Sequence, residues 1–149
     1  MTGYGVVEVS RRGVARLVEC GVIRTSPRTA LPIRIREIYE GVAALVTRHH
    51  PHAASVEAVF QGRNARSALT LGHARGAILL ALSLADVAIA EYAPAEIKKA
   101  VAGTGRATKD QVAFMVQNHL KLKRAPTPAD AADGVAAALC HCIIGDRPR

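Results

Sequence analysis

The beginning of the chain alternates between apolar and polar positions in the way that β-strands do. Residues 3 to 9 alternate, Arg11-Arg12-Gly13 is typical of a turn, and a second stretch of strand character runs from Val14 to Thr25. Two such stretches around a glycine-containing turn predict an antiparallel hairpin.

Residues 31 to 49 switch to the spacing of a helix. One stripe carries the apolar residues of this segment, which are Leu31, Ile35, Ile38, Val42 and Leu45. The charged residues Arg34, Arg36 and Arg48 lie off this stripe. A period near 3.6 residues predicts a helix directly after the hairpin.

The rest of the chain alternates between strand and helix patterns. The predicted elements are a strand over 53–60, a helix over about 65–85, a strand over 87–91, and helices over 94–101, 108–122 and 127–144. Pro94 suits a first helical turn, and Thr108 and Gln111 have the spacing of a capping box. Thr127 is the predicted N-cap of the last helix, with Pro128 in its first turn. A hairpin followed by this alternation indicates an α/β fold with a mixed sheet.

Composition adds size and charge to this picture. The chain has 149 residues and half of them are apolar, which suits one domain with a single core over residues 1–149. Its 20 Lys and Arg residues against 12 acidic residues give a net charge of +8 and a pI near 10.0. This excess favours a polyanionic partner, and nucleic acid comes ahead of a ribosomal or membrane surface.

Further features predict a cytoplasmic protein that does not use a membrane. We find no apolar run of the roughly 20 residues needed to span a bilayer and no basic-then-apolar start typical of a secretory signal. Cys20, Cys140 and Cys142 form an odd set without disulfide spacing, which agrees with a reducing compartment. Because Cys140 and Cys142 point in different directions on a helix, we interpret them as packing residues.

Two acidic residues begin the last predicted helix. Asp130 and Asp133 lie three residues apart, so both carboxylates fall on one face. The alanines around them would let the helix approach the sheet closely. Acidic residues in a first helical turn often do no more than complement the helix dipole, and the pair alone leaves that alternative open.

Glu57 interrupts an otherwise apolar strand pattern over residues 54–60. A partly buried carboxylate needs a hydrogen-bonding partner or a cation, whereas an outward-facing glutamate on an edge strand needs neither. Together with Asp130 and Asp133 it would supply the oxygen ligands that Mg²⁺ and Mn²⁺ prefer. Pairs of such ions stabilise the attacking and leaving oxygens in phosphodiester hydrolysis.

Four blocks of sequence occur in the order seen in the RuvC family of Holliday junction resolvases. The blocks are Thr2-Gly3-Tyr4-Gly5-Val6-Val7, Glu57-Ala58-Val59-Phe60, Ala74-Arg75-Gly76 and Asp130-Ala131-Ala132-Asp133-Gly134. The chain resembles this family over nearly its whole length. The resemblance implies a ribonuclease H-like mixed sheet, an antiparallel hairpin plus parallel strands, flanked by helices, and a metal-dependent endonuclease.

The resemblance also implies roles for individual residues. Glu57, Asp130 and Asp133 would be catalytic ligands of Mg²⁺, with Mn²⁺ as a substitute and two ions per site. The implied DNA contacts are Phe60, Gln61, Arg63, Asn64, Lys98 and Lys109. Ordinary alternatives exist, since an aromatic residue after a buried strand is commonly part of the core and a single lysine is commonly a solvated helix charge. Arg75 is expected to anchor its helix or a dimer.

One part of the family pattern is absent. Family members begin with an inner strand that ends in a metal-binding aspartate directly before the Thr2 block, whereas here Met1 precedes Thr2. The chain as written is therefore expected to be unstable or catalytically weak. A start codon placed too far downstream, a degenerate gene and a true variant are the three explanations, and the first is favoured because a valine-type codon can be read as a start.

The implied reaction is symmetric, magnesium-assisted hydrolysis of a four-way junction in DNA recombination and repair, leaving 5′ phosphates and 3′ hydroxyls. A homodimer is expected because the junction is symmetric, with residues 73–84 as the candidate interface. RuvA and RuvB are implied partners.

The sequence leaves two alternative functions open. The alternatives are a truncated domain that binds branched DNA without cutting it, and a related nuclease that acts on RNA. Residues 103–106 lack the lysine and hydroxyl of a phosphate-binding P-loop, so nucleotide hydrolysis is unsupported.

Overall fold

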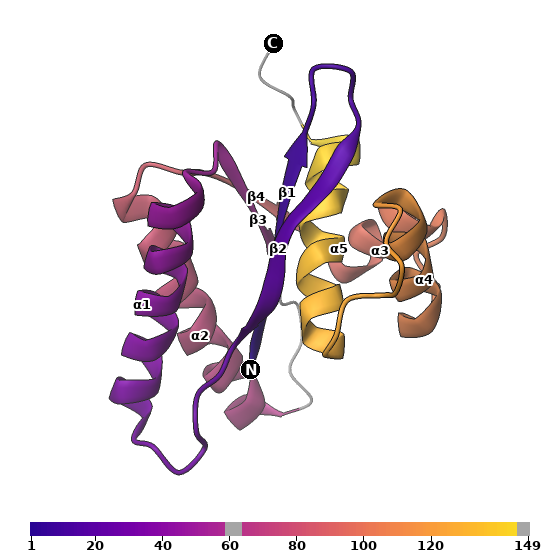
Figure 1. Cartoon of the computed structure of the whole chain (residues 1–149). Helices are drawn as coiled ribbons and strands as arrows, with labels where there is room; N and C mark the ends of the chain where they lie inside the picture. The colour runs from indigo at the N-terminus through magenta and orange to yellow at the C-terminus, as the bar shows by residue number, and fades with distance from the viewer. Residues whose placement is uncertain (59–63, 146–149) are drawn as a thin grey trace.

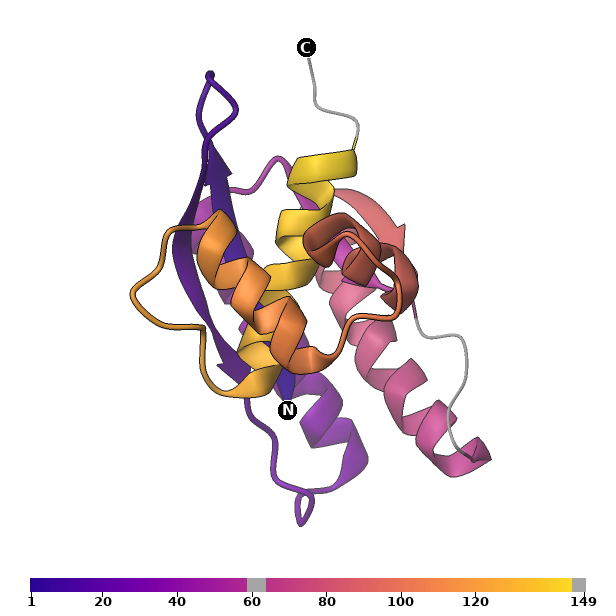
Figure 2. The same ribbon diagram turned by 90° about the vertical axis from the view of Figure 1, so that its right-hand side faces the viewer.

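The computed structural model describes residues 1–58 and 64–145. In chain order its elements are β1 (Thr2–Val9), β2 (Ala15–Ile23), α1 (Leu31–His49), β3 (Ala53–Glu57), α2 (Ala65–Leu84), β4 (Ala88–Tyr92), α3 (Pro94–Ala102), α4 (Lys109–His119) and α5 (Ala129–Ile144). The strands lie between two groups of helices, α1 with α2 on one side and α3, α4 and α5 on the other (Figures 1 and 2). The predicted α/β architecture with flanking helices is confirmed.

The predicted hairpin is present as β1 and β2. The two strands pair antiparallel from Thr2 opposite Ile23 to Val9 opposite Ala15, with an irregularity between Val6 and Val7. Gly13 in the connecting turn has a φ of 79°, a conformation that glycine adopts without steric cost.

The predicted parallel strands are present as β3 and β4. They pair in parallel from Ala53 opposite Ala88 to Glu57 opposite Tyr92, and α2 connects them. A parallel pair needs such a crossover because its two strands start at the same end. Both strands therefore deliver their carboxyl ends, with Glu57 and Tyr92, to one edge of the sheet.

A groove separates the two strand pairs. In the described part of the chain, β1 pairs only with β2 and β3 only with β4. The groove between them has a volume of about 1190 Å³ and is lined by β1, β3 and side chains of α1, α2 and α5. It occupies the position in which the family resemblance places an inner strand. One edge of β1 and one edge of β3 thus face the groove without a strand partner.

Helix α5 packs directly on the hairpin, and three glycines make this close approach possible. A Cβ atom built on Gly3 would lie 1.7 Å from the carbonyl oxygen of Asp130, and one built on Gly5 would lie 2.5 Å from the Cα of Val135. A Cβ on Gly134 of the helix would lie 2.5 Å from the backbone nitrogen of Tyr4. The backbones of α5 and β1 therefore touch, as the alanine-rich sequence of α5 predicted.

Two apolar clusters hold the helices on either side of the strands. The larger joins α3, α4 and α5 around the fully buried Val116, Val135 and Cys140. The smaller joins α1, α2 and the parallel strands around Val42 and Val56. Cys140 and Cys142 both pack in or against the larger cluster, so their interpretation as packing residues is confirmed.

A polar cluster attaches α1 to the hairpin. Glu19 on β2 accepts hydrogen bonds from the Tyr4 hydroxyl at 2.8 Å and from Arg48 at 3.1 Å, and lies 2.7 Å from His49 Nε2. The hydrogen bonds from Tyr4 and His49 lower the pKa of Glu19. The carboxyl-terminal end of α1 is thereby fixed against the middle of β2.

Two predicted helix boundaries were wrong, whereas one strand boundary was right. The pattern over 53–60 predicted a strand that ends on Glu57, and β3 ends there, while residues 59–63 lie outside the described ranges. Helix α4 ends at His119 rather than at residue 122, because Lys121 has a φ of 52° in the left-handed region. Pro128, not Thr127, is the N-cap of α5, and it supplies no side-chain cap.

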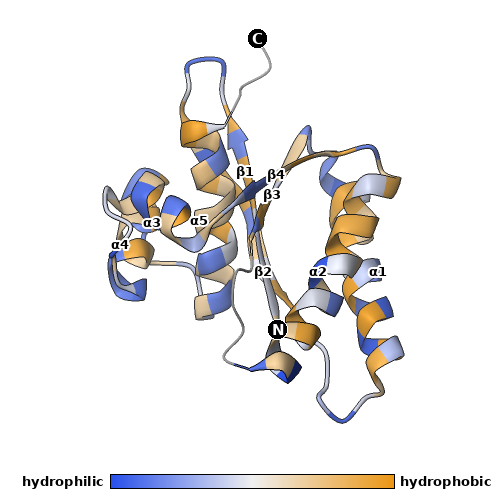
Figure 3. Ribbon diagram, turned by 180° about the vertical axis from the view of Figure 1, so that it is seen from behind, coloured by the Kyte–Doolittle hydropathy of each residue, from blue (hydrophilic) through white to orange (hydrophobic). Residues whose placement is uncertain are grey.

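The expectation about membrane spans also needs correction. Within the described residues, α2 is long and apolar enough to cross a membrane by length and composition alone. Figure 3 shows apolar residues on both α1 and α2. Such a signal is weak evidence, since helices of soluble proteins also meet these criteria.

Replacing Gly5 by alanine is expected to destabilise the protein by about 1–3 kcal/mol, because the added methyl group overlaps the backbone of α5. Gly72→Ala is the matched control, since no atom lies within 4 Å of a Cβ at that position of α2. Alanine should leave stability there unchanged or slightly raised. Thermal unfolding followed by circular dichroism measures both. A Gly5→Ala protein as stable as the wild type would contradict the close packing of β1 and α5.

Candidate active site

Three carboxylates predicted to act together line one end of the groove. Glu57 ends β3, while Asp130 and Asp133 lie in the first two turns of α5, and all three side chains line the groove. Strand β3 finishes near the middle of the molecule and α5 starts in the lower half of the view, both away from the hairpin tip (Figure 1). The contact between Gly3 and Asp130 fixes the start of α5 at this place.

Asp133 has a cationic partner. Lys109, the first residue of α4, donates a hydrogen bond from Nζ to Oδ2 of Asp133 at 3.1 Å. That hydrogen bond and the charge of Asp133 raise the pKa of Lys109, so the ammonium stays charged. Both side chains are largely exposed, and the pair contributes little to stability. Its importance is that a positive charge lies beside the carboxylates.

Glu57 is exposed at the end of β3, which fits the edge-strand alternative in position. Its charge is nevertheless disfavoured: partial desolvation raises the pKa of Glu57, and the negative charge of Asp133 raises it further. Lys109 and Lys98 act in the opposite direction. The four groups therefore lie close enough to influence one another, and added positive charge would favour the ionised carboxylates.

Arg75 of α2 holds the end of β3 in place. It donates a hydrogen bond from Nη1 to the backbone oxygen of Glu57 at 2.7 Å, and its other terminal nitrogen forms an ion pair with Glu91 of β4. Arg75 thus connects α2 to both parallel strands beside Glu57. The prediction that Arg75 anchors its helix is confirmed in this sense.

The predicted DNA contacts divide into three groups. Lys98 and Lys109 lie near the carboxylates, as their effect on Glu57 shows. Asn64 is the N-cap of α2, where its side chain accepts a hydrogen bond from the Ser67 amide at 2.9 Å. Phe60, Gln61 and Arg63 lie outside the described residues.

The structure adds a pair that sequence patterns did not suggest. The hydroxyl of Tyr92, opposite Glu57 in the sheet, lies 2.8 Å from Nδ1 of His141 on α5. His141 also lines the groove. The two residues are 49 positions apart, so no local spacing could have paired them. This contact connects β4 to α5 behind the carboxylates.

Comparisons with known proteins agree with this geometry. The family model described as crossover junction endodeoxyribonuclease RuvC matches residues 1–141. The chain belongs to the RuvC family. A relative of that name from Halorhodospira halophila is 49% identical over 141 residues, which cover 95% of this chain and 83% of the relative. One from Pelotomaculum thermopropionicum is 44% identical, covering 95% and 85%.

Solved structures of the family have the same fold. Thermus thermophilus RuvC in complex with a Holliday junction substrate superposes with a TM-score of 0.89 at 40% sequence identity, covering 95% of this chain and 86% of that one. The structure of Thermus thermophilus RuvC superposes with a TM-score of 0.86. The ribonuclease H-like fold predicted from the sequence is confirmed, and the RuvC family consists of endonucleases that depend on metal ions.

The residues of this chain suit such an ion in their chemistry. Carboxylate oxygens are ligands for hard divalent cations, and three carboxylate residues line the groove. Within residues 1–58 and 64–145, however, no three His, Cys, Asp or Glu side chains converge tightly enough to form a preformed metal cluster. Desolvation, and after it the negative charge of Asp133, raises the pKa of Glu57, so a cation bound there would favour the carboxylate form.

Replacing Glu57 by glutamine is expected to stabilise the protein at neutral pH when divalent ions are absent. Because folding raises the pKa of Glu57 above 4.5, the wild type loses stability as pH rises from about 4.5 through the folded value. Glutamine does not ionise, so the Glu57→Gln protein keeps its stability at pH values above the folded pKa of Glu57. Below about pH 4.5 the two proteins should be equally stable, because Glu57 is then protonated in the wild type.

Melting temperatures at about pH 3.5 and about pH 7.5 in EDTA measure the difference. Glu40→Gln, on the exposed face of α1, is the control and should change little at either pH. A Glu57→Gln protein that melts below the wild type at the higher pH would contradict the raised pKa of Glu57.

Proposed function

We propose that this chain is a Holliday junction resolvase, which cuts four-way DNA junctions symmetrically in recombination and repair. The observation that carries the proposal is that Glu57, Asp130 and Asp133 line one groove, with Lys109 hydrogen-bonded to Asp133. Support also comes from the superposition on a RuvC that is bound to a Holliday junction substrate. The net charge of +8 suits a DNA ligand.

The three carboxylates would be the protein ligands of the metal. Mg²⁺ is the proposed ion, with Mn²⁺ as a substitute and two ions per site. When bound, such ions activate water and stabilise the charge on the scissile phosphate. Arg75 fixes the backbone at Glu57, and the contact of Gly3 with Asp130 fixes the other side of the site. Product strands would carry a 5′ phosphate and a 3′ hydroxyl.

Cationic and polar side chains near the site would hold the DNA. Lys109 beside Asp133 is proposed to contact a phosphate next to the scissile bond, and Lys98 a second one. Asn64 caps the start of α2 and would contact the DNA at that position. Phe60, Gln61 and Arg63 remain proposed contacts in the segment between β3 and α2.

A second candidate function is binding of branched DNA without cleavage. The observation that favours it is the lack of three converging metal ligands in the described residues. The basic surface does not depend on that convergence. Cleavage and binding must therefore be measured separately.

The first test incubates the full chain with a labelled four-way junction and with linear duplex, with Mg²⁺ or with EDTA. We expect paired nicks in the junction only when Mg²⁺ is present. Asp133→Asn and Glu57→Gln should each lower the nicking rate at least about 100-fold, because each removes a metal ligand, while binding persists.

Glu40→Gln, remote from the site on α1, should cut like the wild type. Binding by the wild type without nicking in Mg²⁺ or Mn²⁺ would overturn the resolvase proposal in favour of the binding function. Equal affinity for junction and duplex would overturn both.

The proposed enzyme is a homodimer of single-domain chains spanning residues 1–149, because a two-fold axis places two active sites on opposed strands of a symmetric junction. The candidate interface lies on α2. Three of its large apolar side chains, Leu69, Leu80 and Leu84, fall on one face of the helix and are exposed. A monomer rarely exposes so many neighbouring large apolar groups. A self-association surface would also explain the apolar composition of α2.

Leu80→Glu is expected to convert the dimer into a monomer, since the charge would be buried in the interface without a partner. Analytical ultracentrifugation measures the change. Phe114→Glu on α4, also an exposed apolar residue, is the control and should leave the dimer intact. If the Leu80→Glu protein sediments as the wild type does, α2 is not the interface.

RuvA and RuvB are proposed partners of the dimer, and the cytoplasm is its proposed location. Both proposals rest on membership of the family. A pull-down of the purified dimer with RuvA bound to junction DNA tests the first.

A further inference from the structure

The segment that connects β2 to α1 is rich in positive charge. Residues 24–36 contain four arginines and no acidic residue. Arg24 and Arg28 lie in the connection itself and are exposed, whereas Arg34 lies in the first turns of α1. We call residues 24–30 the β2–α1 connection. Its arginines were not among the DNA contacts that the family resemblance implies.

The charges of this connection are not neutralised by neighbours. Elsewhere in the described chain Arg16, Arg36, Arg48 and Arg75 form ion pairs with glutamates. Within the same described residues no carboxylate lies within ion-pairing distance of Arg24 or Arg28. Arg24 contacts only the neutral sulfur of Met1, at 3.3 Å. Two guanidinium groups are thus available for an anionic ligand.

The connection is held in a defined conformation. The amide of Thr29 donates to the carbonyl of Ser26 at 3.1 Å, and the amide of Arg28 donates to the Ser26 hydroxyl at 3.2 Å. Arg34 donates from Nε to the hydroxyl of Thr25 at 3.3 Å. A segment that is already ordered loses less conformational entropy when it binds a ligand.

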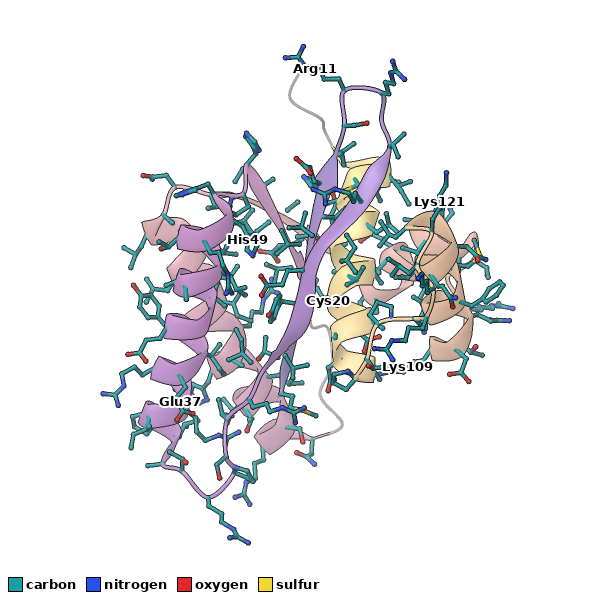
Figure 4. The ribbon with its side chains drawn as sticks, in the orientation of Figure 1. Arg11, Cys20, Glu37, His49, Lys109 and Lys121 are labelled. Atoms are coloured by element: carbon teal, nitrogen blue, oxygen red, sulfur yellow. The ribbon has the colours of Figure 1, made fainter. Side chains whose placement is uncertain are left out.

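The connection lies at the end of the molecule opposite the hairpin tip. In Figure 1 the chain leaves β2 and enters α1 at the bottom of the molecule, in the same half as the start of α5. The hairpin tip, with Arg11, lies at the opposite end, far from Lys109 (Figure 4). Arg11 and Arg12 are also exposed and carry the same charge. The protein therefore contains a natural comparison between two arginine pairs at its two ends.

We propose that Arg24 and Arg28 bind backbone phosphates of a DNA arm that extends from the cut site past the start of α1. Guanidinium groups form paired hydrogen bonds with phosphate oxygens, which suits this role. The contacts carry no base specificity and serve to orient the arm relative to the carboxylates. This inference rests on the proposed function and adds a substrate-binding segment to it.

The test measures junction binding in EDTA as a function of salt concentration for the full chain and two double variants. Arg24→Gln with Arg28→Gln should weaken binding roughly 10-fold at low salt and lower the slope of log affinity against log salt by about 2, one for each lost phosphate contact. Arg11→Gln with Arg12→Gln removes the same charge at the other end and should leave the slope unchanged.

Cleavage adds a second readout. In Mg²⁺ the Arg24→Gln, Arg28→Gln variant should have a raised KM and an unchanged kcat, because the metal site is intact. Arg28→Gln alone guards against misfolding, since no side-chain hydrogen bond of Arg28 is present among the described contacts, and its slope should fall by about 1.

The outcomes separate the two proposals. Equal slopes for the wild type and the Arg24, Arg28 variant, or equal losses in both double variants, overturn the role of the β2–α1 connection while junction binding by the wild type stands. A wild type that does not bind the junction overturns the proposed function, and this inference with it.

Discussion

The contact between α5 and β1 is the constraint on which the rest of the structure depends. Gly3, Gly5 and Gly134 let two backbones approach to a distance that any larger residue would prevent. This contact buries Val135 completely and places the first turn of α5 at the end of the groove. Asp130 and Asp133 are therefore positioned by the packing of Gly134 and Val135 of the same helix against β1, and the chemistry of the site depends on that packing.

The second side of the site depends on polar contacts. Arg75 binds the last carbonyl of β3 and the side chain of Glu91, so the end of the parallel pair is fixed to α2. Glu19 fixes α1 to the hairpin in the same way. Because the strand pairs are not hydrogen-bonded to each other in the described residues, these helices carry the connection across the groove. Negative charge gathers at its end, and Lys98 and Lys109 balance it only in part.

This distribution of charge suits a metal-dependent nuclease. Desolvation and the charge of Asp133 raise the pKa of Glu57, so a bound cation would favour its ionised form, and the cationic side chains nearby suit a phosphate backbone. Helix α2 both binds the end of β3 through Arg75 and exposes Leu80 and Leu84, so one helix would serve both the site and the proposed dimer. The β2–α1 connection extends the basic surface away from the cut site. Catalysis, symmetry and substrate orientation would thus use different faces of adjoining elements.

The sequence by itself determined the hairpin, the order of strands and helices, and the family, because these follow from local periodicity and from collinear blocks such as Asp130 to Gly134. It also indicated Glu57, Asp130 and Asp133, since acidic residues in apolar surroundings are unusual. Helix ends at His119 and Pro128 were misjudged by a few residues, because backbone angles there depend on local packing. Only the tertiary structure decided the pairing of Lys109 with Asp133, of Arg75 with Glu57 and of Tyr92 with His141. Such contacts join residues far apart in the chain, and no local pattern encodes them.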